Sequence, residues 1–145
     1  MRVLVLCTGN RWRSPLLARS IQALRPGWEV RSAGTHCSRP RADVPRAWRA
    51  CVDGWVEPHV SRKAEREDVW WADVVVGVQR SHEAFAKSHK LDARVVVCKL
   101  ADPAFQRVSA WLALARAVSD AAAVIVAAIE AEPDVVTCAL PLLEA

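Results

Sequence analysis

The chain has no tyrosine, and only two phenylalanines, one methionine and five glycines occur among its 145 residues. Without tyrosine, the protein cannot be regulated by phosphorylation of its own tyrosine side chains. Its five cysteines are an odd number and show no repeated spacing. A disulfide framework is therefore not expected, and the cysteines indicate a reducing compartment. No internal repeat or low-complexity tract is present, which excludes a repeat architecture.

We expect neither a targeting signal nor a membrane-spanning segment in this sequence. Arg2 opens a strand-like run instead of an apolar signal core, so we expect a cytoplasmic protein. The most apolar stretch, Val108 to Ile129, contains Arg116 and Asp120 and indicates a buried amphipathic helix, with no membrane partner. No histidine or cysteine has a partner at metal-ligand spacing, so we predict no metal site.

The overall composition is that of a single globular domain covering residues 1–145. Hydrophobic residues make up 52% of the chain and charged residues 25%. The formal net charge of +4 favours anionic substrates or partners in general. No nucleic-acid-binding motif accompanies this charge, so nucleic acid is not an expected partner.

Short apolar runs alternate with helical patterns along the chain. Strands are predicted at Val3 to Leu6, Trp28 to Ser32, Asp73 to Val78 and Arg94 to Cys98. Helices are predicted at Pro15 to Leu24, Pro45 to Val52, Glu65 to Trp71, Ser81 to Ser88 and Ser109 to Glu130. This alternation predicts a three-layer α/β fold, in which helices cover both faces of a four-stranded parallel sheet.

Residues 7–14, hereafter the anion loop, join the first predicted strand to the first predicted helix. Cys7 and Arg13 bracket five residues there, and we expect Ser14 to be the helix N-cap with Pro15 at the first helical position. Backbone N–H groups converge at such a junction, and the helix dipole is positive there. The environment favours a bound oxyanion and a cysteine thiolate.

Phosphoryl transfer to a protein nucleophile fits these residue types. Cys7 is the candidate nucleophile, and Arg13 with the loop amides can hold the equatorial oxygens. Asp102 follows the fourth predicted strand, at the same edge of the sheet as Cys7, and is the candidate acid for the leaving group. Gly9 permits unusual backbone angles, and Asn10 tolerates a left-handed one.

The sequence resembles the low molecular weight protein tyrosine phosphatase family. Five motifs carry the resemblance, in family order: the anion loop ending in Arg13-Ser14-Pro15, then Ser32-Ala33-Gly34-Thr35, His59-Val60-Ser61-Arg62, Ala72-Asp73-Val74-Val75-Val76 and Asp102-Pro103. The resemblance implies a strand order of 2-1-3-4 and a two-step reaction through a phosphocysteine, with no metal or organic cofactor. Catalysis would fall to Cys7, Arg13 and Asp102.

The same resemblance assigns the remaining site residues. A hydrogen-bond network that keeps the loop rigid would comprise Asn10, Ser14, Ser32 and His59. The Ser14 hydroxyl would also donate to the Cys7 thiolate. Substrate contacts would come from Thr8, Gly9, Asn10, Arg11, Trp12, Ser14 and Phe105.

Four positions depart from the family pattern. Trp12 stands where many members have a second cysteine that rescues the nucleophile from oxidation, and its bulk could crowd the loop. Arg11 lines the pocket mouth, where tyrosine phosphatases often have an aliphatic residue and phosphoarginine-specific relatives a threonine. Its charge would favour acidic sequence around a phosphosite. Phe105 stands alone where two aromatics are frequent, and Gln79 replaces a frequent acidic residue, which leaves one loop contact open.

The expected function is hydrolysis of phosphotyrosine in a phosphorylated protein by a monomer or weak dimer. Three alternatives stay open: a phosphoarginine phosphatase, an arsenate reductase-like enzyme and a catalytically impaired phosphate-binding module. The reductase needs two further cysteines near the acid, and only Cys98 lies there in the sequence. The sequence names no physiological substrate.

Overall fold

The structure is a computed structural model that describes residues 1–42, 59–103, 107–131 and 137–138. Strands and helices alternate along these residues, as predicted. Their order is β1 (Arg2–Cys7), α1 (Arg13–Leu24), β2 (Glu29–Gly34), α3 (Arg66–Trp71), β3 (Val74–Gly77), α4 (Arg80–His89), β4 (Val95–Cys98), α5 (Val108–Glu130) and β5 (Thr137–Cys138). The helix expected at Pro45 to Val52 lies outside the described residues.

The strands form one parallel sheet in the order β2-β1-β3-β4-β5. The predicted order 2-1-3-4 is therefore confirmed, and the two-residue β5 adds a strand beside β4. Register places Cys7 opposite Gly34 and Leu6 opposite Gly77. The carboxyl ends of β1, β2 and β3 thus meet at one edge, where ligands bind in open parallel sheets.

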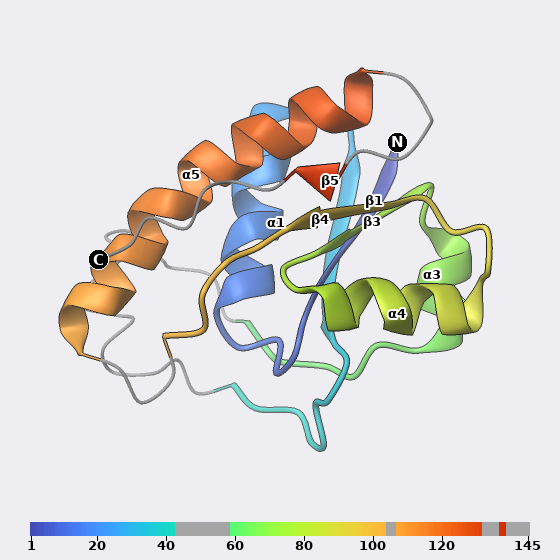
Figure 1. The fold of residues 1–145 in the computed structure, drawn as a ribbon. Coiled ribbons are helices and arrows are strands. Elements are labelled where there is room, and N and C mark those ends of the chain that lie inside the picture. The colour runs from blue at the N-terminus through green and yellow to red at the C-terminus, as the bar shows by residue number, and fades with distance from the viewer. Residues whose placement is uncertain (43–58, 104–106, 132–136, 139–145) are drawn as a thin grey trace.

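Helices cover both faces of the sheet, which gives the three predicted layers. Val3 and Val5 of β1 point to the side that packs against α1 and α5. Leu4 and Leu6 point to the other side, into the cluster shared with α3 and α4. Figure 1 shows α1 and α5 together on one side of the strands, with α3 and α4 on the other. Since both faces of β1 are buried, its apolar run is continuous rather than alternating.

Helix α5 is the long apolar segment noted in the sequence. Its residues Ser109–Glu130 are long and apolar enough to cross a membrane by length and composition alone. In the structure, Ala121, Ala122 and Ile125 of this helix are fully buried in the cluster formed with α1 and the sheet. The expected buried amphipathic helix is therefore confirmed.

The start of α1 differs from the sequence-based expectation. The helix begins at Arg13, its N-cap residue is Trp12, and no side chain caps it. The prediction that Ser14 is the N-cap and Pro15 the first helical residue is therefore wrong. The Ser14 hydroxyl contacts the Cys7 thiol instead, at 3.0 Å. A side chain committed to the loop interior cannot also satisfy the free amides of the first helical turn.

Gly34, the last residue of β2, lies against the backbone of the anion loop. A Cβ at this position would lie 2.8 Å from the Thr8 carbonyl oxygen and 3.0 Å from the Asn10 nitrogen. The next two residues continue the contact, because Thr35 N donates to the Cys7 carbonyl at 3.0 Å and His36 N donates to the Thr8 carbonyl at 2.9 Å. Glycine therefore allows β2 to support the loop from behind.

Replacing Gly34 with alanine should destabilise the protein, because the clash involves backbone atoms that cannot rotate away. We expect Gly34→Ala to lower the free energy of unfolding by about 1 to 3 kcal/mol, measured by urea denaturation. Gly27→Ala is the matched control, since a Cβ at Gly27 meets nothing within 4 Å. Equal stability of the two variants would contradict the close approach.

Candidate functional site

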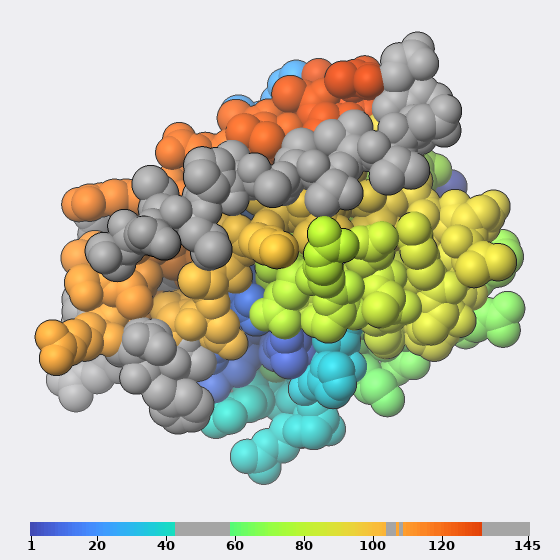
Figure 2. All heavy atoms as spheres, in the orientation of Figure 1, coloured from blue at the N-terminus to red at the C-terminus, as the bar shows by residue number. Residues whose placement is uncertain are grey.

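The anion loop lies at the carboxyl edge of the sheet, between three other segments of the chain. Figure 2 shows its blue atoms surrounded by the cyan segment after β2, the yellow-green start of α4 and the amber segment after β4. Residues distant in sequence therefore meet at this edge. The arrangement agrees with the position predicted for Cys7 at the end of β1.

The Cys7 thiol is buried and takes part in two hydrogen bonds. Its Sγ lies 3.0 Å from Ser14 Oγ and 3.1 Å from the backbone nitrogen of Asn10, which donates to it. Asn10 Nδ2 donates to Ser14 Oγ at 2.9 Å. Because that hydroxyl oxygen already accepts from Asn10, its proton is available for Cys7. Two hydrogen-bonding groups of the loop therefore point at the Cys7 sulfur.

Asn10 connects the anion loop to the surrounding structure. Its φ of 54° is the left-handed conformation expected from the sequence, and its side chain is fully buried. Nδ2 also donates to Ser32 Oγ at 3.0 Å, and Oδ1 accepts from Arg62 N at 3.0 Å. His59 Nε2 donates to the Asn10 carbonyl oxygen at 2.7 Å. The structure thus brings together the four residues predicted to hold the loop.

Arg13 is almost wholly buried, with 2% of its surface exposed. Nη1 donates to Gln79 Oε1 at 2.8 Å and to the Leu100 carbonyl at 3.1 Å. Gln79 therefore makes the contact that the sequence left open, through a neutral amide. Nε is buried and has no hydrogen-bond partner among the described residues. A buried guanidinium donor without a partner is suited to an anionic ligand.

Asp102 lies close to Arg13, as expected from its place after β4. Asp102 Oδ2 lies 3.5 Å from Arg13 Nη2, and 42% of the aspartate side chain is exposed. Its other oxygen, Oδ1, accepts from the indole Nε1 of Trp12 at 3.1 Å. The Arg11 guanidinium carbon lies 5.4 Å from the centre of the Trp12 ring. Phe105 lies outside the described residues.

His82 is a site residue that the sequence analysis missed. Its ring is fully buried, and Nδ1 accepts from the backbone nitrogens of Val78 at 3.2 Å and Gln79 at 3.1 Å. Nε2 therefore carries the proton and donates to Thr8 Oγ1 at 3.2 Å. The sequence showed only a histidine on a helix, and its pairing with the distant Thr8 left no local signal.

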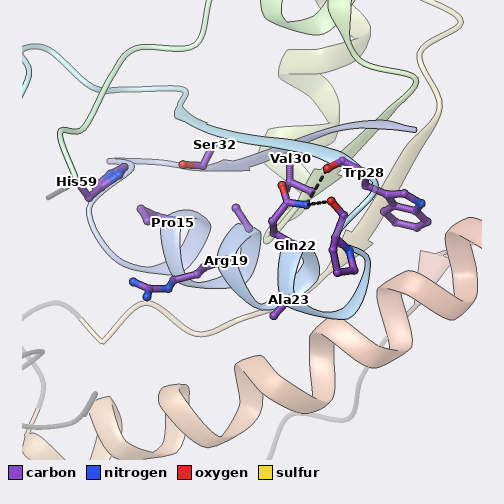
Figure 3. A pocket seen from close by; sticks show the side chains of 10 residues that line it. Pro15, Arg19, Gln22, Ala23, Trp28, Val30, Ser32 and His59 are labelled. Carbon is purple, nitrogen blue, oxygen red and sulfur yellow. Dashed lines mark hydrogen bonds between the residues drawn. The ribbon is translucent and has the colours of Figure 1, made fainter. Parts of the chain in front are cut away.

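A groove of about 620 Å³ lies on the other side of the network, between α1 and β2. Figure 3 shows Arg19 of α1 on one wall and Val30 of β2 on the other. Ser32 and His59 line the groove and also contact Asn10, whereas Cys7 and Arg13 are not among its lining residues. The groove therefore adjoins the support of the anion loop, not its reactive side.

No group of three histidine, cysteine or acidic side chains in the described part of the chain is arranged to hold a metal ion. The site combines a thiol that two hydrogen-bonding groups contact, a buried guanidinium and a neighbouring carboxyl. Together these groups can bind an oxyanion, attack it and transfer a proton.

The buried His82 makes stability depend on pH. Burial, followed by the positive charges of Arg13 and His36, lowers the pKa of His82 from 6.5 to about 4. Between these two values the unfolded chain binds a proton that the folded protein does not. Neutral His82 therefore stabilises the folded protein most above pH 6.5. This contribution to the free energy of unfolding, about 3 kcal/mol in total, should be lost as the pH falls toward 4.

The variant His82→Gln should remove this part of the pH dependence, because glutamine has no titrating group and suits the capping position at the start of α4. His89→Gln, on the same helix, is the control and should keep it. Urea denaturation between pH 7 and pH 4.5 measures both. If His82→Gln kept the wild-type dependence of the free energy of unfolding on pH, another group would be responsible.

No family model matches the sequence, but comparison with known proteins finds relatives and similar folds. The chain is similar to the low molecular weight protein-tyrosine-phosphatase Etp of Escherichia coli strain K12, with 36% identity over 84 residues. It is also 31% identical over 84 residues to a protein-arginine-phosphatase of Geobacillus stearothermophilus. Each match covers 57% of both proteins, so the chain spans just over half the length of the curated relatives it matches.

Solved structures share the fold over most of the chain. The YwlE arginine phosphatase from Geobacillus stearothermophilus has a TM-score of 0.77 at 21% identity, covering 90% of this chain and 93% of that one. The Erwinia amylovora tyrosine phosphatase amsI has a TM-score of 0.78 at 19% identity, covering 88% and 91%. These matches show that the chain has the fold of the YwlE and amsI phosphatases, and its similarity in sequence to Etp extends over 84 residues.

Proposed function

We propose that the protein is a cysteine-dependent phosphatase that hydrolyses phosphotyrosine in proteins. The observation that carries the proposal is the meeting of three groups at one edge of the sheet. The Cys7 thiol lies on the loop that Arg13 closes, and the Asp102 carboxyl lies 3.5 Å from that arginine. Nucleophile, anion-binding cation and proton donor are the three parts that this reaction needs.

The first step is attack on the phosphoryl group. The Cys7 thiolate forms an S–P bond in line with the aryl oxygen, whose bond to phosphorus breaks. Asp102 gives its carboxyl proton to the departing oxygen, which leaves as a phenol. Arg13 Nε, together with the loop amides, holds the equatorial oxygens as charge develops on them.

The second step restores the enzyme. A water molecule attacks phosphorus, and the Asp102 carboxylate accepts a proton from it. The S–P bond breaks, which releases inorganic phosphate and the Cys7 thiolate. The hydrogen bonds from Ser14 and Asn10 to Sγ stabilise that thiolate as a leaving group. The two steps together consume the phosphate ester and one water molecule, and the protein is regenerated.

Arg11 supports phosphotyrosine in an acidic sequence as the substrate. Its guanidinium lies against Trp12 in the same loop as Arg13, so the site is strongly positive. A phosphoarginine side chain brings a second guanidine group toward these cations, whereas a phenyl ring brings no charge. The free thiols of Cys7 and Cys37 fit the reducing cytoplasm as the place of action.

A phosphoarginine phosphatase is the second candidate. The similarity to the Geobacillus stearothermophilus protein-arginine-phosphatase, at 31% identity, favours it. Matched peptides that carry phosphotyrosine or phosphoarginine at the same position separate the two. We expect the larger kcat/KM for phosphotyrosine, and a reversed preference would replace the substrate without removing the mechanism.

Site-directed variants test the mechanism itself with p-nitrophenyl phosphate. Cys7→Ser should abolish turnover, because a hydroxyl at this site is a far weaker nucleophile than a thiolate. Asp102→Asn should lower kcat by about 100-fold, the lower range for loss of general acid–base catalysis. Initial rates of nitrophenol release measure both effects.

Cys37→Ser is the control, because this cysteine is also buried but its thiol bonds to the Arg39 carbonyl. Its activity should equal that of the wild type. Full activity in Cys7→Ser would contradict the mechanism. Phosphate binding without hydrolysis of any phosphoester would identify a binding module instead.

A further inference from the structure

The indole N–H of Trp12 donates to Asp102 Oδ1 at 3.1 Å, and the mechanism above does not use this bond. We propose that Trp12 is a positioning residue, which holds the Asp102 carboxyl in the orientation for proton transfer. The inference rests on the proposed phosphatase function. It concerns the position at which many family members have a cysteine.

The Trp12 ring is fixed by groups other than Asp102. It makes an edge contact with the Trp111 ring of α5, at 5.1 Å between centroids and 71° between planes. The Arg11 guanidinium lies on it at 5.4 Å. The Trp12 carbonyl accepts from Leu16 N at 3.1 Å, which ties the backbone to the first turn of α1. The direction of the indole N–H is therefore set before the carboxyl meets it.

Asp102, in contrast, lies where the backbone support from β4 ends. Leu100, two residues before it, is held on both sides: its N–H donates to the Val78 carbonyl and its carbonyl accepts from Arg13, both at 3.1 Å. Two residues later, the Asp102 side chain is 42% exposed. A half-exposed carboxyl on a loop samples several rotamers unless donors select one. The indole N–H is such a donor.

The two oxygens of Asp102 meet donors of different kinds. Arg13 Nη2 reaches Oδ2 at 3.5 Å, whereas Trp12 Nε1 reaches Oδ1 at the shorter 3.1 Å. In the reaction, Arg13 must also hold the phosphoryl oxygens. The indole is uncharged, and it bonds to Oδ1 whether the carboxyl is protonated or ionised. Because the indole holds Oδ1, the transferable proton is assigned to Oδ2, the oxygen on the side of Arg13, which binds the phosphoryl group in the proposed reaction.

The variant Trp12→Phe tests this role, because it keeps a ring against Trp111 and removes the N–H. Two substrates are compared: phenyl phosphate, whose leaving group needs protonation, and 2,4-dinitrophenyl phosphate, whose leaving group needs little. We expect kcat/KM to fall about tenfold for the first and less than about threefold for the second. The ratio of the two values does not depend on the fraction of folded enzyme.

Trp70→Phe is the matched control, since it removes an exposed indole N–H bonded to the His89 carbonyl at 3.1 Å. Both substrates should be hydrolysed at wild-type rates. In an Asp102→Asn background, Trp12→Phe should cause no further loss on phenyl phosphate, because no acid remains to be oriented.

Equal losses on both substrates, or a tenfold loss that persists with Asp102→Asn, would overturn the positioning role. Hydrolysis that depends on Cys7 would survive either result, so the proposed function would stand. If the wild-type protein hydrolysed neither aryl phosphate, or if Cys7→Ser kept full activity, the proposed function would fail and the role of Trp12 with it.

Discussion

The buried amide of Asn10 is the interaction on which the site depends. Its side chain bonds to Ser14 of α1, Ser32 of β2 and the backbone of Arg62, so three segments are held to one residue. Its backbone has a left-handed φ of 54°, a conformation that persists only where the surroundings enforce it. The same conformation places the Asn10 N–H on Cys7 Sγ. The shape of the anion loop and the hydrogen bonding of its thiol are therefore consequences of one buried network.

The burial of the Arg13 charge is a second constraint on the site. Burying a guanidinium lowers stability unless donors are satisfied and charge is balanced. Here Gln79 and the Leu100 carbonyl satisfy Nη1 without adding negative charge, and Asp102 is half exposed. Most of the positive charge thus remains available to an anion. The neutral His82 agrees with this, because a second buried cation beside Arg13 would be unfavourable.

Local patterns predicted the strands and the placement of Cys7 and Asp102 at one edge of the sheet, because the carboxyl ends of parallel strands share an edge, whereas the sheet order was expected only from the family resemblance. Contacts between distant residues were harder to foresee. The close approach of Gly34 depends on how the anion loop turns across the end of β2, and the bond from His82 to Thr8 depends on where α4 lies relative to the loop. Ser14 was misplaced because a cap signal in sequence does not reveal a competing partner in space.

A tryptophan at position 12, in place of a cysteine, affects two properties of the site: the orientation of Asp102 and the oxidation of Cys7. A cysteine at this position is short and a weak donor, so it can reach a neighbouring sulfur but cannot orient a carboxyl as an indole does. The indole reaches Asp102 because Trp111 and the start of α1 fix its ring. It offers no thiol to form a protective disulfide with Cys7. A better-oriented Asp102 carboxyl and a Cys7 thiol more open to irreversible oxidation are therefore expected together, since both follow from the same side chain.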